Sequence, residues 1–334
     1  MTAQDQSSIV RGLRPTVTIV ICTYHRAAIL RKCLEAIKQL DPPPDEVIVV
    51  DNTPGDLEAK AAAREYSVQY AVEPLQGLGR ARNRGFAESK SDVVAYLDDD
   101  ALPDREWLNY LLEPFAEPEV AVVAGKVVTP QSRTDESAPE TPVSISNKDP
   151  QWFVIAAFGG VGMGGNMAVR KVAASGGKIF DERLGRGTLL DGFEDNRAFV
   201  GIVSRGFRAV HMPAAIVSHP PLRTCTIERD GPKVIVYWLL LFLECADCRV
   251  DLMRFLYGRL RHKPLTWKRD PLAFGPLVRS GWQQRIKAGI AGILLYIQVR
   301  KYDRPGAGVR RAEEKLRQAA LLDAEAHGVG DRPG

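Results

Sequence analysis

Three consecutive carboxylates, Asp98, Asp99 and Asp100, directly follow the apolar run 93–97. Such a run indicates a buried strand, so the three acids stand at a strand end. Because neighbouring carboxylates repel one another, their clustering indicates a cation between them. Oxygen ligands favour Mg²⁺ or Mn²⁺, which complete their coordination with water and substrate phosphates. The cluster therefore predicts a metal-bridged nucleoside diphosphate site, and the alternative is a solvated acidic turn before a helix near Pro103.

The first 130 residues alternate between strand and helix patterns. Apolar runs predict strands over 17–22, 47–50, 68–72 and 93–97, and helical spacing predicts helices over 27–39, 56–66 and 78–89. Buried strands joined through helices predict an α/β fold with a mainly parallel, Rossmann-like sheet flanked by helices. Ligands of such sheets bind at the carboxyl ends of the strands. Thr23, Asp51, Glu73 and Asp98 stand at those ends, so we expect them to surround one ligand.

A glycine-rich stretch dominates the second part of the chain. A strand is predicted over 120–129, followed by a flexible loop over 130–150 that is rich in proline, serine and charge. Residues 159–165 hold five glycines and lead into a strand over 167–170. Glycine there permits close approach of the backbone to a ligand or a neighbouring strand. The stretch lacks the strand-turn-helix context of a dinucleotide-binding loop.

Composition divides the chain into regions. With 334 residues, 45% of them hydrophobic, the chain can bury a sizeable core. Residues 1–14 are polar and predicted to be disordered, without the layout of a secretory signal. Residues 1–220 hold 24 basic and 29 acidic side chains, whereas 221–334 hold 21 and 12. We therefore expect an α/β domain followed by a basic helical region, which carries no nucleic-acid-binding motif.

Two short apolar segments lie in the basic region. Residues 234–243 and 288–297 are each too short to span about 30 Å of hydrocarbon. Either they lie at an anionic membrane surface or they pack as core helices; packing is favoured for the first, and both readings stay open for the second. The five cysteines are scattered, which favours a reducing, cytosolic setting. Cys245 and Cys248 are expected to be two thiols on a helix face.

Eight short motifs occur in the order typical of one enzyme family. They occupy residues 20–26, 46–51, 77–85, 97–100, 164–167, 180–185, 194–195 and 217–219. Over roughly residues 16–220 the chain resembles the family 2 glycosyltransferases. The resemblance implies a GT-A fold over 15–220, with nucleotide-sugar binding over 15–130, the acceptor and base half over 150–220, and 221–334 as a helical C-terminal extension. It also implies an inverting enzyme, and the absence of the Gln-x-x-Arg-Trp motif of processive synthases indicates transfer of a single sugar.

The resemblance implies a donor-binding set and a metal site. The donor-binding residues are Thr23, Tyr24, Arg26, Asp51, Arg80, Asn83, Asp98 and Asp99, and the metal ligands are Asp98, Asp100 and His219. Asp51 would accept a hydrogen bond from the nucleotide base, and Mn²⁺ or Mg²⁺ would bridge the two phosphates. Arg80, Arg82 and Asn83 begin a predicted helix, whose dipole would assist phosphate or base binding. An exposed helix face is the alternative for Arg80, and a capped, solvent-facing imidazole is the alternative for His219.

Asp195 and Glu194 match the catalytic position of the family. Asp195 is expected to remove the proton of the acceptor hydroxyl, and Glu194 to orient that hydroxyl or the helix terminus. Ordinary acids at a helix N-terminus are the alternative. The expected donor is a UDP-, dTDP- or GDP-sugar, and the expected acceptor is a hydroxyl in glycan, polysaccharide or glycoconjugate biosynthesis. A lipid-linked glycan at the inner face of the cell membrane is one candidate acceptor.

Two other functions fit parts of the pattern. A nucleotidyltransferase would also place metal carboxylates on an α/β sheet, but it should carry a basic, glycine-rich phosphate loop after the first strand. Residues 23–26 are not such a loop. A catalytically inactive nucleotide-sugar-binding or carbohydrate-binding relative is the other alternative, because a fold alone does not establish catalysis. The presence of both the metal carboxylates and Asp195 favours the enzyme.

Overall fold

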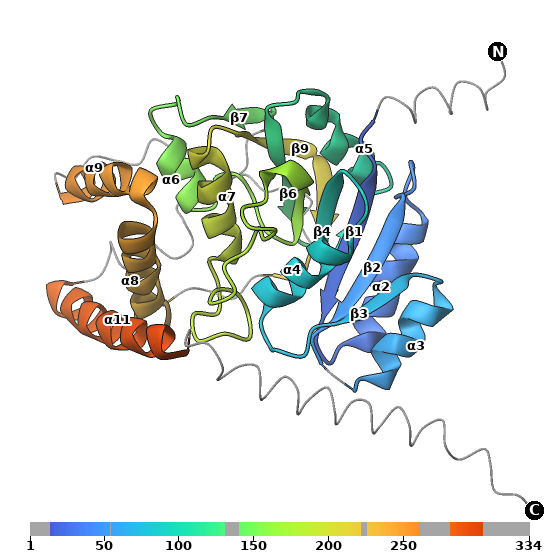
Figure 1. The fold of residues 1–334 in the computed structure, drawn as a ribbon, viewed down its shortest axis with the longest axis horizontal. Coiled ribbons are helices and arrows are strands. Elements are labelled where there is room, and N and C mark those ends of the chain that lie inside the picture. Colours follow the sequence, from blue (N-terminus) through green and yellow to red (C-terminus); the bar gives the residue numbers. More distant parts are fainter. Residues whose placement is uncertain (1–13, 54, 131–139, 222–225, 261–280, 303–334) are drawn as a thin grey trace, which may run out of the picture.

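The computed structural model of the chain describes residues 14–53, 55–130, 140–221, 226–260 and 281–302, and Figure 1 shows their arrangement. The strands are β1 Val17–Thr23, β2 Glu46–Asp51, β3 Gln69–Val72, β4 Val93–Asp98, β5 Leu102–Pro103, β6 Val120–Val128, β7 Val143–Ile145, β8 Asn166–Arg170 and β9 Arg208–Ser218. The helices are α2 Ala27–Lys38, α3 Leu57–Glu65, α4 Leu78–Glu88, α5 Trp107–Leu112, α6 Trp152–Ala157, α7 Glu194–Ser204, α8 Ile227–Glu244, α9 Arg249–Leu260 and α11 Trp282–Tyr302. The predictions for residues 1–13 and for the middle of the 130–150 loop lie outside the described residues.

The strands form one mixed sheet in the order β3-β2-β1-β4-β8-β6-β9-β5, with β7 paired to β9. The first four strands are parallel, as predicted from their continuous apolar runs. Strand β8 runs antiparallel between β4 and β6, and β6 pairs in parallel with β9. Thr23 of β1 lies opposite Asp51 of β2, and Cys22 of β1 lies opposite Asp98 of β4. The carboxyl ends of the three strands therefore meet at one edge of the sheet.

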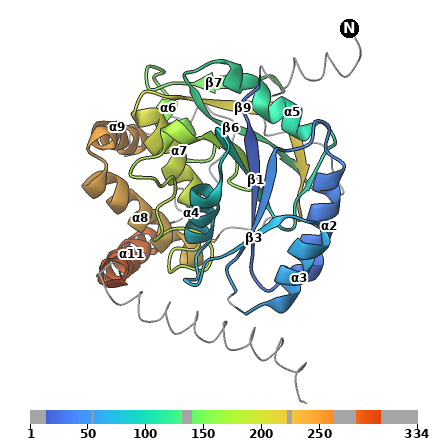
Figure 2. The same cartoon turned by 45° about the vertical axis from the view of Figure 1, so that its right-hand side comes forward.

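Helices cover both faces of the sheet. Side chains alternate along β1, so that Ile19 and Ile21 face one core and Val20 faces the other. The first core lies beneath α2, α3 and α5, and the second lies beneath α4, α6 and α7. Figure 2 shows these helix layers on opposite sides of the strands. The alternation explains why strands near the middle of the sheet read as uninterrupted apolar runs.

In the described part of the C-terminal region, α8, α9 and α11 are helices, as predicted, and α8 packs against the rest of the domain. Residues Val234, Tyr237 and Leu241 of α8 join the second core, so packing of the 234–243 segment is confirmed. Helix α11 packs on α8 (Figure 1). Within the described residues, no helix combines the length and the apolar character needed to cross a membrane.

Two local predictions are wrong. The helix expected near Pro103 begins only at Trp107, because Leu102 and Pro103 form β5 and pair with β9. Cys245 and Cys248 are joined in a disulfide instead of remaining two thiols on a helix face. Cys245 ends α8 and Cys248 lies in the short 3-10 turn that follows, so the chain reverses there and brings the two sulfur atoms together.

Candidate active site

The three acids after β4 point to different partners. Asp98 accepts a hydrogen bond from Arg82, with 3.1 Å between the atoms. Asp99 is buried, accepts from the Thr23 hydroxyl at 2.8 Å and pairs with Arg26 at 2.7 Å. Burial raises the pKa of Asp99 to about 6, although Arg26 and Thr23 oppose the shift. Asp99 thus holds the ends of β1 and β4 together.

Asp98, Asp100 and His219 come together at the strand edge. Their ligand atoms all lie within 4.8 Å of one another, as expected for groups that hold one metal ion. The His219 Nε2 atom lies 3.0 Å from an Asp100 oxygen and 3.8 Å from an Asp98 oxygen. Its Nδ1 atom lies 2.6 Å from the Pro220 carbonyl, which orients the imidazole so that Nε2 faces the acids.

Protonation in this cluster follows from the same contacts. The hydrogen bond from His219 lowers the pKa of Asp100 below its usual range, and Arg26 adds to the effect against burial. Burial opposes the charge on His219, but its hydrogen bonds to Asp100 and Pro220 outweigh burial and raise its pKa. Asp100 is therefore held as the carboxylate, which is the form that ligates a cation.

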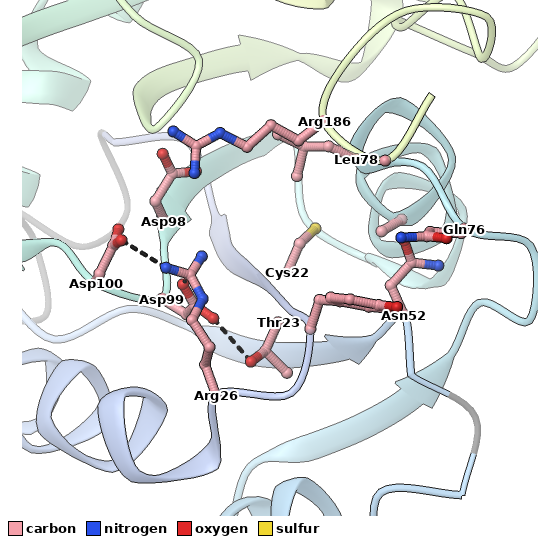
Figure 3. Close-up of a pocket in the computed structure, with 13 residues that line it drawn as sticks. Cys22, Thr23, Arg26, Asn52, Gln76, Leu78, Asp98, Asp99, Asp100 and Arg186 are labelled. Atoms are coloured by element: carbon pink, nitrogen blue, oxygen red, sulfur yellow. Dashed lines mark hydrogen bonds and ion pairs between the residues drawn. The ribbon is translucent and has the colours of Figure 1, made fainter. Parts of the chain in front are cut away.

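A pocket of about 340 Å³ opens beside the acids. Its lining includes Cys22, Thr23, Tyr24, Arg26, Asn52, Gln76, Leu78, Ala81, Asp98, Asp99, Asp100, Arg186 and Gly187. Figure 3 shows these side chains gathered around one hollow, with Arg26 and the acids on one side and Asn52 and Gln76 on the other. Five of the predicted donor-binding residues, Thr23, Tyr24, Arg26, Asp98 and Asp99, therefore share a single pocket. The ring of Tyr24 is 44% exposed and offers a face for stacking.

Asp51 lies behind the pocket wall. It is buried, accepts from the Thr53 amide and from the Tyr70 hydroxyl, both at 2.7 Å, and does not line the pocket. Burial raises its pKa to about 6, against the effect of both hydrogen bonds. Its neighbour Asn52 reaches the pocket instead, and binds the Glu73 carbonyl and the Gly77 amide, each at 2.8 Å. The base contact expected of Asp51 stays a prediction.

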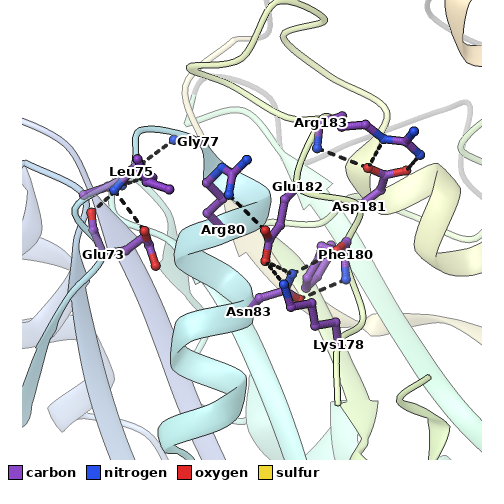
Figure 4. Close-up of polar contacts among 11 residues, drawn as sticks. Glu73, Leu75, Gly77, Arg80, Asn83, Lys178, Phe180, Asp181, Glu182 and Arg183 are labelled. Carbon is purple, nitrogen blue, oxygen red and sulfur yellow. Dashed lines mark hydrogen bonds and ion pairs between the residues drawn. The ribbon is translucent and has the colours of Figure 1, made fainter. Parts of the chain in front are cut away.

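Arg80 and Asn83 hold a loop. Arg80 pairs with Glu182 at 2.9 Å. Asn83 is buried, donates to the Phe180 carbonyl at 2.9 Å and accepts from the amides of Ile179 and Phe180 (Figure 4). These bonds tie α4 to the segment before α7, which carries Arg186. The structure thus gives both residues a supporting position, and neither lines the pocket.

This arrangement predicts a stability loss for Asn83→Ala. The change would leave the buried amide and carbonyl of Phe180 without their partner, which costs about 1–3 kcal/mol of unfolding free energy. Urea denaturation followed by circular dichroism measures the loss. Arg84→Ala is the matched control on the same helix, because it removes only an exposed ion pair with Glu88, worth about 0–1 kcal/mol. Equal stability of the two variants would contradict the supporting role.

Arg82 connects the two halves of the site, a role that its sequence position did not reveal. It is buried, and its guanidinium donates to Glu194 at 3.0 Å and to Asp98 at 3.1 Å. A Cβ atom at Gly164 would lie 2.4 Å from this guanidinium, and one at Gly165 would lie 2.2 Å from an Asp98 oxygen. The backbone of the glycine-rich stretch therefore approaches β4 and α4 closely, as predicted. Arg82 and Asp98 leave no room for a side chain at Gly164 or Gly165.

Glu194 and Asp195 begin α7. The Asp195 carboxylate accepts from the Gly164 amide at 2.9 Å and from the Asn196 amide at 2.7 Å, and its side chain is half-buried. Burial and the nearby Asp195 raise the pKa of Glu194 to about 7, although Arg82 opposes the shift. Arg82 thus joins Glu194, the neighbour of the predicted base, directly to Asp98 of the predicted metal site.

Arg186 is a charged pocket residue that lies outside the motifs. It lies in an irregular segment between two glycines with positive φ, Gly185 and Gly187, and the Leu78 amide donates to its carbonyl at 2.8 Å. Figure 3 shows its side chain across the pocket on the side of Asp98. Among the described residues, no carboxylate forms an ion pair with it, whereas Arg26 and Arg82 are both paired. In the sequence, a basic residue next to the glycine that ends the 180–185 motif could have indicated this position.

The fold is the GT-A fold, which is found in glycosyltransferases. Two solved structures share the fold: the mannosyltransferase PcManGT of Pyrobaculum calidifontis, in complex with GDP-Man and Mn²⁺, and residues 1–349 of TarS of S. aureus, in complex with UDP-GlcNAc. The first has a TM-score of 0.53, 19% identity, and coverage of 92% of this chain and 86% of that one. The second has a TM-score of 0.56, 15% identity, and coverage of 95% and 93%.

Sequence comparison finds similarity to a family of glycosyltransferases. Residues 18–175 match the family model of glycosyl transferase family 2. The chain is 29% identical over 223 residues to the pre-mycofactocin glycosyltransferase of Mycobacterium tuberculosis, covering 61% of this chain and 42% of that protein. It thus spans less than half the length of this relative. Over residues 18–175, just under half of the chain, the sequence is therefore similar to glycosyl transferase family 2.

Proposed function

We propose that this chain is a metal-dependent, inverting glycosyltransferase that moves one sugar from a nucleoside diphosphate donor to a hydroxyl acceptor. The meeting of Asp98, Asp100 and His219 at the mouth of the pocket carries the proposal. Two carboxylates and one imidazole suit Mn²⁺, and Mg²⁺ is the alternative. The solved mannosyltransferase, whose fold is similar, holds GDP-Man with Mn²⁺.

The proposed donor site uses the pocket and the metal cluster. Asp98, Asp100 and His219 would hold a divalent cation, which would neutralise the charge of the leaving diphosphate. Tyr24 offers its exposed ring to the base, and Thr23 and Asp99 keep the strand ends in place. Arg26, which pairs with Asp99 and Asp100, is positioned to bind a phosphate oxygen.

Asp195 is the proposed general base. As the acceptor oxygen attacks the anomeric carbon, Asp195 would take the hydroxyl proton, and the bond between that carbon and the diphosphate oxygen would break. One displacement inverts the configuration of the sugar. The amides of Gly164 and Asn196 fix the Asp195 carboxylate, and Arg82 with Glu194 fixes the start of α7. An NMR assignment of the anomeric configuration of the product tests the inverting step directly.

The acceptor and its location are further parts of the proposal. We place the enzyme in the cytoplasm, in contact with the inner face of the cell membrane, and its acceptor in glycan or glycoconjugate biosynthesis, with a lipid-linked glycan as the first candidate. The basic residues after 220 support this choice, because anionic lipids attract them. Incorporation of labelled sugar into extracted lipid tests it.

A donor screen tests the activity without any acceptor. UDP-, dTDP- and GDP-sugars are incubated with the chain and Mn²⁺, and the release of nucleoside diphosphate is followed. We expect slow hydrolysis of one donor class that stops when EDTA removes the metal. A catalytically inactive binding relative would bind a donor with Mn²⁺ and release nothing.

Arg186→Ala should slow donor cleavage by about 100-fold or more. Among the cations that line the pocket, Arg186 alone has no ion pair with a described residue, so it is available for the charge that develops on the departing diphosphate. The measurement is the rate of nucleoside diphosphate release at saturating donor. Arg84→Ala, which removes a cation from the exposed face of α4, should cleave donor at the wild-type rate.

A further inference from the structure

Helix α11 has apolar side chains on two opposite faces. One face packs on α8: Ala288 and Val299 are buried, and Gly292 lies so close to Ile235 that a Cβ atom there would be 2.6 Å away. The sequence left open whether residues 288–297 pack or meet a membrane. Packing accounts for this face alone.

The other face of α11 is an exposed apolar stripe. Apart from the adjacent pair Ile293 and Leu294, its members follow one another at intervals of three and four residues, so they share one side of the helix. The stripe consists of Trp282, Ile286, Ile290, Ile293, Leu294 and Ile297, each between 46% and 70% exposed. Single exposed apolar residues are ordinary, but a continuous row of six large ones indicates an interaction surface.

The charges of α11 all have one sign. Its sequence contains Arg285, Lys287, Arg300 and Lys301 and no acidic residue. Arg285 and Lys287 are exposed beside the stripe, and Arg300 is exposed while pairing at 3.3 Å with Glu244 of α8. An apolar stripe flanked by cations complements a bilayer with anionic headgroups, because the apolar side chains enter the acyl boundary and the cations meet phosphate groups.

A small core connects α11 to the wall of the pocket. Leu184 and Leu190, on either side of Arg186, pack with Val236 and Leu240 of α8 and with Val299 of α11. Arg183 of the same segment pairs with Glu244, which also pairs with Arg300. The stripe and the pocket are therefore two sides of one packed unit. Figure 1 shows α8 between α11 and the rest of the domain.

We propose that the exposed stripe of α11 docks this chain onto the surface of an anionic lipid bilayer. The absence of acidic residues from the helix favours lipid over a second copy of the chain, since two such faces would bring eight like charges together. The evidence for docking comes from α11 alone and does not depend on the proposed function. Its use, which is to present the pocket to an acceptor at the membrane, rests on the proposed function.

Vesicle flotation of the full chain tests the proposal. The wild type should float with vesicles that contain phosphatidylglycerol, bind pure phosphatidylcholine more weakly, and lose part of its binding at high salt. Ile290→Asp combined with Ile293→Asp should lower the bound fraction at least about 10-fold, because two charges would enter the apolar boundary. Val172→Asp is the matched control: Val172 is also exposed, at 71%, but lies far along the chain from α11.

Three results of the vesicle assay would each overturn the docking. The wild type could stay unbound with anionic vesicles, the double variant could float like the wild type, or the control could lose binding equally. Light scattering after gel filtration detects the competing occupant of the stripe, which is a second copy of the chain. A wild-type dimer that does not bind vesicles, together with a monomeric double variant, would also overturn the docking. Circular dichroism and donor hydrolysis show whether the double variant is folded. Failure of donor hydrolysis in a wild type that floats would count against the proposed function and leave the docking standing.

Discussion

Replacing Asp195 by asparagine is expected to lower sugar transfer by about 100- to 10,000-fold, the usual contribution of a general base. An asparagine side chain has the same shape as aspartate and can still accept from the Gly164 amide, so the start of α7 should keep its geometry. What the variant loses is the ability to take the proton of the acceptor hydroxyl. Donor affinity should stay unchanged, because Asp195 does not line the donor pocket.

The measurement combines two assays on the same preparation. Single-turnover transfer reports the chemical step, and calorimetric titration of the donor with Mn²⁺ reports binding. Asp41→Asn is the control, since that carboxylate forms only an exposed pair with Arg105. Transfer by Asp195→Asn at the wild-type rate would falsify the base assignment, whereas loss of both transfer and donor binding would point to a structural role.

The second large effect is expected for Asp100→Asn. The pKa of Asp100 is lowered, and Asp100 stands between His219 and Arg26. A neutral amide is a poorer ligand for a hard cation, so Mn²⁺-dependent donor affinity should fall by at least about 10- to 100-fold, the loss seen when only a supporting partner of a metal ligand is removed. The donor titration is repeated over a range of Mn²⁺ concentrations.

Asp99→Asn provides the matched comparison at the adjacent position. Asp99 contacts Thr23 and Arg26 and lies outside the metal cluster, so this variant should keep the Mn²⁺ dependence of donor binding. Any loss should appear in thermal stability. If the two variants lose Mn²⁺ dependence to the same degree, the structure assigns the wrong acids to the cation.

Much of the fold could be predicted because buried strands and amphipathic helices leave periodic patterns. The parallel order of β1, β2 and β4 follows from their apolar runs, and it brings Thr23 and Asp98 to one edge. The antiparallel position of β8 between β4 and β6 could not be predicted, because the sequence of a five-residue strand does not show which strands it pairs with. The reversal that joins Cys245 to Cys248 likewise depends on the packing of α8 and α9.

The site was predictable where chemistry is local in the sequence, and not where it depends on distant partners. Consecutive acids at a strand end indicated a cation, and the structure brings His219 to them from the end of β9. Arg82 was expected at a helix start that assists phosphate or base binding, yet it is buried, and Asp98 and Glu194 compensate its charge. Arg186 lies in an irregular segment whose path is set by α4, so no periodicity could place it in the pocket.

Titration calorimetry of UDP-, dTDP- and GDP-sugars into the chain, with Mn²⁺ and then with EDTA, shows whether a metal ion holds the donor. One donor class should bind with Mn²⁺, EDTA should abolish this binding, and Asp100→Asn should weaken it. Binding of a donor with equal affinity in EDTA, or no donor binding with Mn²⁺ or Mg²⁺, would contradict a cation held by Asp98, Asp100 and His219.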